Sequence, residues 1–137
     1  MKKTGISFSF DKDAIDFFSG FGDKLDQARM DVVDAAGVVW ADSAKLITQA
    51  DQHIDTGAYV NSIGYATNFS GPNGSEVGKV IHDIQDEKTS TILTLGSGVD
   101  YAESLEKKFN IFARALDESQ DDITKVSTAI VKKTLGG

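Results

Sequence analysis

The longest periodic stretch of this chain is residues 23–51, which read DKLDQARMDVVDAAGVVWADSAKLITQAD. Apolar residues recur there at steps of three and four, the spacing of one face of an α-helix. These residues are Leu25, Ala28, Val32, Ala36, Val39, Leu46 and Ile47, with Trp40 beside them. Asp23 is suited to cap the first turn. The stretch therefore predicts one long amphipathic helix around which the rest of the domain packs.

Gly37 lies in the middle of this predicted helix. Glycine costs a helix interior about 1 kcal/mol relative to alanine. Two explanations are open. Gly37 either marks close packing against a neighbouring element or is merely tolerated.

Segments with the composition of β-strands lie on both sides of the long helix. Residues 6–10 alternate apolar and polar side chains, as a half-buried strand does. Residues 62–69, 77–84 and 89–95 are further strand candidates, mostly rich in Thr, Ile and Tyr. A short helical turn is expected at 11–18, before a break at 20–22. Turn formers gather at residues 70–75, 86–88 and 96–98.

The C-terminal third returns to helical spacing, with apolar residues stepping by three and four from Phe109 to Ile130. Acidic residues lead and lysines trail in this stretch, as the helix dipole favours. Together these elements predict one α+β domain spanning residues 1–137. In it a long N-terminal helix and a C-terminal helix pack on a small antiparallel β-sheet.

The composition excludes several classes of function. A formal net charge of −7 argues against a protein that grips nucleic acid, which needs clustered Lys and Arg. The same charge would let DNA slide past without sticking, or it serves only solubility. No apolar run approaches the ~20 residues of a membrane helix. The chain has no cysteine, which excludes disulfides and thiolate metal sites.

The motif Asp55-Thr56-Gly57-Ala58 matches the signature of aspartic proteases. A single-loop chain would have to dimerise so that two such carboxylates share a proton. In those proteases the motif follows a hydrophobic strand, whereas here it follows a helical stretch. The structural alternative is that Asp55 caps a turn through the amides near Gly57, where glycine permits the backbone conformation.

Two segments about forty residues apart resemble a family of tailed-bacteriophage proteins. The first is Asp55-Thr56-Gly57 followed by Asn61-Ser62-Ile63, after a long helix. The second is Tyr101-Ala102, followed by Glu106 and by Phe112, Arg114 and Leu116. In this order and spacing they resemble the head–tail joining family, also described as neck, tail completion or minor tail component proteins. The chain departs from the family pattern at Ala58-Tyr59-Val60, at Lys107-Lys108 and in lacking a proline near Ala115.

The resemblance implies a structural virion protein rather than an enzyme. Copies would form a ring homo-oligomer in the neck, between portal-side adaptors and the tail tube or tail terminator. DNA would pass through the channel without specific binding, and no cofactor, metal or membrane is implied. The protein would be made in the bacterial cytoplasm and end in the virion. The alternatives are another neck or tail component such as a tail terminator, a homodimeric aspartic protease using Asp55-Thr56-Gly57, and an intracellular α+β module with no viral role.

The residues proposed to form the motif and interface come from both segments. They are Asp55, Thr56, Gly57, Asn61, Tyr101, Leu105, Glu106, Phe109 and Arg114. Tyr101, Leu105, Phe109 and Phe112 place large apolar groups beside Lys107 and Lys108, as an interface patch does. The alternative is that all four apolar residues fill the core. The two histidines, His53 and His82, have no metal-ligand spacing around them.

Overall fold

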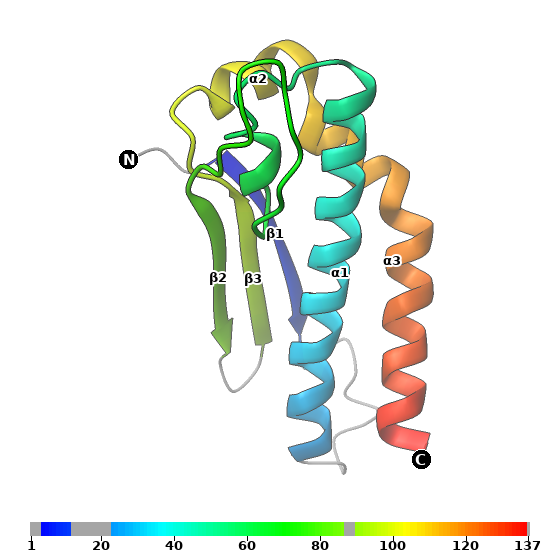
Figure 1. Ribbon diagram of the computed structural model, residues 1–137. Coiled ribbons are helices and arrows are strands. Elements are labelled where there is room, and N and C mark those ends of the chain that lie inside the picture. Colours follow the sequence, from blue (N-terminus) through cyan, green and yellow to red (C-terminus); the bar gives the residue numbers. More distant parts are fainter. Residues whose placement is uncertain (1–3, 12–22, 87–89, 137) are drawn as a thin grey trace.

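The computed structural model describes residues 4–11, 23–86 and 90–136 and shows the expected α+β architecture (Figure 1). The predicted helical turn at 11–18 and the break at 20–22 lie almost entirely outside these residues. The elements, in chain order, are β1 (Thr4–Asp11), α1 (Asp23–Ala50), the 3-10 turn η2 (Val60–Ser62), β2 (Val80–Asp86), β3 (Ser90–Ser97), α2 (Ala102–Phe109) and α3 (Ile111–Gly136).

The three described strands form one antiparallel sheet in the order β1-β3-β2. The central strand β3 pairs Leu95 with Ile6 on one side and Leu93 with Ile84 on the other. Leu93 and Leu95 are fully buried, as expected of the strand with neighbours on both sides.

The predicted strand at 6–10 is confirmed, and that at 89–95 is confirmed over its described residues, from Ser90. The strand predicted at 77–84 runs instead from Val80 to Asp86, and β3 continues through Ser97 into the turn predicted at 96–98. The turn predicted at 86–88 lies mostly outside the described residues.

The long helix α1 lies between the sheet and α3 (Figure 1). Gly37 allows its close approach to β3, because a Cβ atom there would lie 2.8 Å from Leu93 Cδ2. Close packing is therefore the correct explanation of this glycine. On the side of the last helix, Trp40 Nε1 donates a hydrogen bond to the Phe112 carbonyl at 3.0 Å. Trp40 and Phe112 join Leu93 and Leu95 in one core.

The predicted strand at 62–69 is wrong. The chain makes the short turn η2 and then runs irregularly to the start of β2 at Val80. One amide of this segment, that of Gly64, donates to the β3 carbonyl of Gly96 at 3.0 Å, and several other backbone groups bond to side chains. Lys45 of α1, only 2% exposed, donates to the carbonyls of Val60 and Tyr65 at 2.8 and 2.9 Å. The same ammonium donates to Thr67 Oγ1 at 3.0 Å, and these bonds override the local strand propensity.

Replacing Lys45 with methionine is expected to destabilise the fold by about 2–4 kcal/mol, because buried carbonyls lose their donor. The effect should also depend on pH. Burial lowers the pKa of Lys45 from 10.5 to about 8, so the unfolded chain binds more protons between these values. The stability of the unaltered protein should therefore rise with pH across that interval relative to Lys45→Met.

Urea unfolding followed by circular dichroism between pH 7 and pH 9.5 checks both parts of this prediction. Lys132→Met, at an exposed lysine of α3, is the control for loss of a positive charge. If the two variants unfold at the same urea midpoint with parallel pH profiles, the hydrogen bonds from buried Lys45 do not stabilise the fold as proposed.

Candidate functional site

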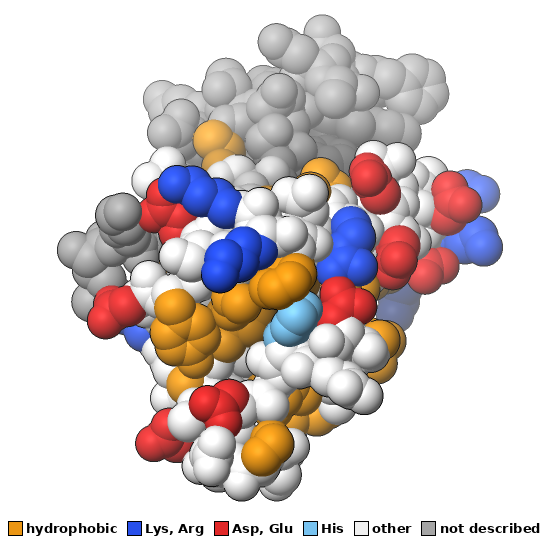
Figure 2. Space-filling view, turned by 90° about the horizontal axis from the view of Figure 1, so that it is seen from above, with side chains coloured by type: hydrophobic (Ala, Val, Ile, Leu, Met, Phe, Trp, Pro, Cys, Tyr) orange, Lys and Arg blue, Asp and Glu red, His pale blue; other side chains and the backbone are white. Residues whose placement is uncertain are grey.

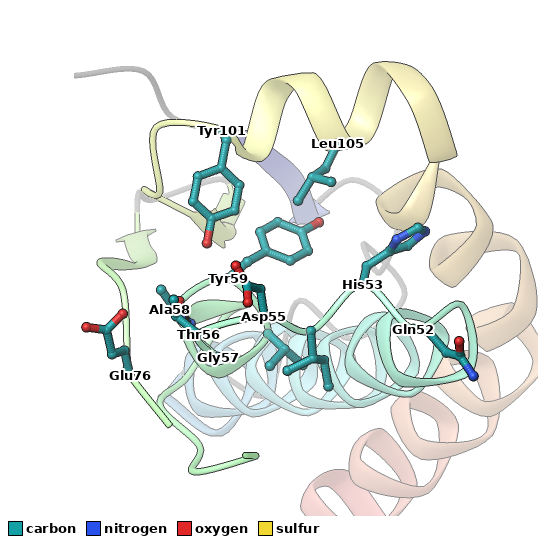
Figure 3. A pocket seen from close by; sticks show the side chains of 12 residues that line it. Gln52, His53, Asp55, Thr56, Gly57, Ala58, Tyr59, Glu76, Tyr101 and Leu105 are labelled. Atoms are coloured by element: carbon teal, nitrogen blue, oxygen red, sulfur yellow. Dashed lines mark hydrogen bonds between the residues drawn. The ribbon is translucent and has the colours of Figure 1, made fainter. Parts of the chain in front are cut away.

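The two segments singled out in the sequence face each other across one pocket of about 650 Å³ at the end of the domain. Residues 52–60 form one wall and floor, Glu76 lies at one side, and Tyr101 and Leu105 come from the start of α2. Figure 3 shows the side chains of Tyr101 and Leu105 above Tyr59, with Asp55 and Thr56 below. The fold thus joins segments that are about forty residues apart in the sequence.

Backbone hydrogen bonds hold the first segment in place. The amide of Asn73 donates to the Asp55 carbonyl at 3.1 Å, and the amide of Glu76 donates to the Thr56 carbonyl at 2.7 Å. The amide of Gly78 donates to the Ala58 carbonyl at 2.9 Å. The predicted turn at 70–75 is closed by a bridge between Gly71 and Gly74. These hydrogen bonds therefore join residues 55–58 to residues 73–78 in the same chain direction, as in a short parallel ladder.

Asn61 is the buried centre of this region. Its Nδ2 donates to the carbonyls of Phe69 and Glu76, both at 2.9 Å. Its Oδ1 accepts from the Phe69 amide at 2.7 Å and from Thr67 Oγ1 at 3.0 Å. The amide can make four such bonds, and here it makes all of them. Asn61 is therefore a structural residue that ties residues 67, 69 and 76 to η2.

Gly57 is required by the same arrangement. Its φ of +92° lies in the region that favours glycine, and a Cβ atom there would lie 2.8 Å from Asn61 Nδ2. The expected freedom of this glycine is thus confirmed. The spacing from Gly57 to Asn61 reflects a direct contact.

The expected capping role of Asp55 is wrong. Its carboxylate accepts a hydrogen bond from the Asn73 side-chain amide, on the far side of the ladder. The following turn is capped by Thr56, whose Oγ1 accepts from the Ala58 amide at 3.2 Å. Among the hydrogen bonds of the described residues, the Ala58 amide of this turn donates to Thr56 and not to the Asp55 carboxylate. Asp55 remains exposed at the rim of the pocket.

Glu106 connects α2 with α3. Asn110 breaks the helix between them with a φ of +51°, which leaves the first amides of α3 without helical partners. Glu106 Oε1 accepts from the Phe112 amide at 2.7 Å and Oε2 accepts from the Ala113 amide at 3.2 Å. A carboxylate is favourable here because it also faces the positive end of the helix dipole.

Arg114 and Phe109 join this helix connection to the end of α1. Arg114 Nε donates to the Phe109 carbonyl at 3.0 Å, and its guanidinium pairs with the Asp51 carboxylate. The rings of Phe109 and His53 lie 3.9 Å apart between centroids. The motif residues Glu106, Phe109 and Arg114 therefore fix the orientation of α2.

The predicted apolar patch divides into core and surface. Phe112 is only 2% exposed and stacks on Tyr59 at 6.0 Å between ring centroids, so it belongs to the core. Leu105 and Phe109 are half-buried, and Tyr101 is 46% exposed. Figure 2, which looks down on this end, shows lysine and arginine side chains beside hydrophobic ones. The exposed part of the patch is therefore centred on Tyr101.

Sequence reasoning missed Tyr59, the most buried aromatic residue of the pocket. It is 2% exposed, and its hydroxyl has no hydrogen-bond partner among the described residues. Burial raises the pKa of Tyr59, and the charges of Glu106 and Tyr101 add to that effect. Its position between Ala58 and Val60, beside a glycine turn, gave no signal of this burial.

The histidines lie apart, with His82 3.4 Å from the Asp34 carboxylate and His53 3.9 Å from that of Asp51. No group of three potential metal ligands occurs among the described residues. No helix within the described ranges is long and apolar enough to cross a membrane.

Comparisons with protein-family models, curated proteins and solved structures found no match.

Asn61→Ala is expected to lower the stability by about 2–4 kcal/mol, because it removes four part-buried hydrogen bonds and leaves the Phe69 amide without its partner. The measurement is the urea midpoint, with amide hydrogen exchange at residues 69 and 76 as a local readout. Asn68→Ala is the matched control, since that side chain is exposed in the same loop. Equal midpoints for the two variants would contradict the central role of Asn61.

Proposed function

We propose that this protein is a structural component of the neck of a tailed phage or prophage. Copies assemble as a ring that joins the DNA-filled head to the tail and leaves a channel for DNA. The observation that carries this proposal is the meeting of the two resembling segments around one pocket at one end of the domain. Two short sequence matches could each arise by chance. Because the two segments form one local structure, they are better explained as parts of a single family pattern.

The roles of the motif residues support the proposal further. Gly57 and Asn61 shape the first segment, while Glu106 and Arg114 orient the second. The fold therefore explains why each of these residues occurs at its position in the sequence. By orienting α2, they place the exposed Tyr101 and the lysines of the last turn of α2 at the surface.

The net charge of −7 supports a channel that DNA crosses without being held. A wall that neutralised many phosphates would bind DNA strongly by releasing counterions. An acidic ring repels the backbone instead and lets the duplex move. A ring also requires two different faces of each copy to meet, which is a heterologous contact that closes by rotation.

The gene supplies the direct test. Deleting it from the phage that carries it should yield DNA-filled heads without tails, together with free tails, as seen by electron microscopy. The unaltered gene supplied in trans should restore tailed particles. Tails of abnormal length would point to the tail-terminator alternative, and normal infectious particles without the gene would overturn the proposal.

Tyr101→Ser, supplied in trans, tests the exposed residue of α2. We expect a melting temperature close to that of the unaltered protein, because Tyr101 is half-exposed, but a loss of tailed particles of about tenfold or more. Val38→Ser is the matched control, at an apolar residue that is 51% exposed on α1. Tailed particles at equal yield for both variants would exclude Tyr101 from the contact.

The protease hypothesis makes a different prediction at Asp55. Asp55→Asn should leave the fold and head–tail joining unchanged, since the new side chain keeps an oxygen that can accept from Asn73. Unfolding curves and particle yield measure both effects. A peptidase activity of the unaltered protein that Asp55→Asn abolished would contradict the structural proposal.

A further inference from the structure

An apolar side chain stands exposed on the outer side of the helix pair α1 and α3. Leu46 is 63% exposed, although its helical spacing places it with the residues expected to be buried. It lines two adjoining hollows between the helices, of about 660 and 290 Å³. Val39 and Val126 line the larger one beside it. Together these hollows make a groove, called here the α1/α3 groove.

The groove continues a seam of small and apolar residues along α1. Residues 32, 36, 39, 43, 46 and 50 follow steps of four and three, the spacing of a helix that packs against other helices. Val32 and Ala36 are buried, but Leu46 and Ala50 are exposed. The seam is thus covered at its beginning and open toward its end.

The rim of the groove is acidic. Asp42, Glu118 and Asp122 line the larger hollow with a single base, Lys125. Three carboxylates against one ammonium leave a negative rim around an apolar floor. An occupant with the opposite pattern, an apolar side chain flanked by positive charges, would fit this surface.

The helix α2 supplies positive charge in its last turn, while the charged residues nearest to Tyr101, Asp100 and Glu103, are acidic. Its exposed side carries Tyr101 at the start and Lys108 one heptad later, next to Lys107. Lys107 lies 3.4 Å from the Glu103 carboxylate, whereas Lys108 has no ion-pair partner among the described residues. A helix of eight residues spans about 12 Å, short enough to lie in a groove between two helices.

One copy does not fill its own groove with its own α2. That helix lies across the end of the domain, and its connection to α3 is fixed through Glu106 (Figure 1). The groove lies along the sides of α1 and α3. We infer that the α1/α3 groove receives α2 of a second copy, and this inference rests on the proposed ring. Such a contact joins two different surfaces, so it propagates from copy to copy.

Cysteine crosslinking tests the contact, and the absence of native cysteine makes it specific. Leu46→Cys and Lys108→Cys are made in separate copies and then mixed under mild oxidation. Crosslinked dimers should form in the mixture and in neither variant alone. Gln85→Cys replaces Lys108→Cys as the control, at an exposed position of β2. The experiment uses the purified protein at high concentration and phage particles that carry both variants.

The outcomes separate the possible occupants. Crosslinking of Leu46→Cys with itself would show two grooves face to face and overturn the inference. Absence of the mixed product from both the purified protein and the particles would also overturn it. The gene deletion tests the proposed function independently. If the deletion yields tailless heads but the two cysteine variants form no mixed crosslink, the proposed function stands and only this contact is refuted.

Charge reversal gives a second readout by sedimentation. Lys107→Glu with Lys108→Glu should weaken self-association by about tenfold or more, and Glu118→Lys with Asp122→Lys should do the same. A mixture of the two double variants should recover association, because the charges are complementary in both orientations that bring unlike variants together. No recovery in the mixture, with both variants folded by circular dichroism, would contradict the pairing of α2 with this rim.

Discussion

The buried amide of Asn61 is the interaction on which the pocket end of this domain depends. Residues 51–79 contain only one short 3-10 turn, yet they must enclose a pocket and leave few buried backbone groups unpaired. Loops of this length are usually either functional or disordered. Asn61 satisfies three backbone groups, and Lys45 satisfies two more from the helix side. These two polar side chains replace the ladder that a strand would have supplied.

The residues of the resemblance divide by what they touch. Gly57, Asn61, Glu106 and Arg114 contact this chain's own backbone, so their spacing is set by the fold. A pattern built of such residues carries information about shape. Recognition would then belong to side chains that the pattern merely positions, such as Tyr101, which is 46% exposed in the pocket wall.

The regular elements could be predicted because each has a strong period. The helix α1 and the strands β1 and β3 follow from side-chain spacing alone. The supposed strand at 62–69 could not be excluded, because the bonds that Lys45 and Asn61 make there connect distant residues. The break at Asn110 was equally hidden, since neither glycine nor proline marks it.

Burial within a helical face was harder to predict than the helix itself. Lys45 lies on the buried side and Leu46 on the open side, the reverse of what their chemistry suggests. Periodicity gives the direction of a side chain but not the extent of the element that covers it. Such local conflicts between residue type and environment are expected at functional or strained positions.

The helix connection links the fold to the geometry of the proposed ring. In a closed ring, the angle between the two contacting surfaces of one copy sets the number of copies. In the ring proposed above, one surface would be α2 and the other the groove along α1 and α3. Glu106 holds α2 to the first turn of α3, and Arg114 holds the same connection to Asp51 at the end of α1. These motif residues would therefore set the angle between the two surfaces without lying in either of them.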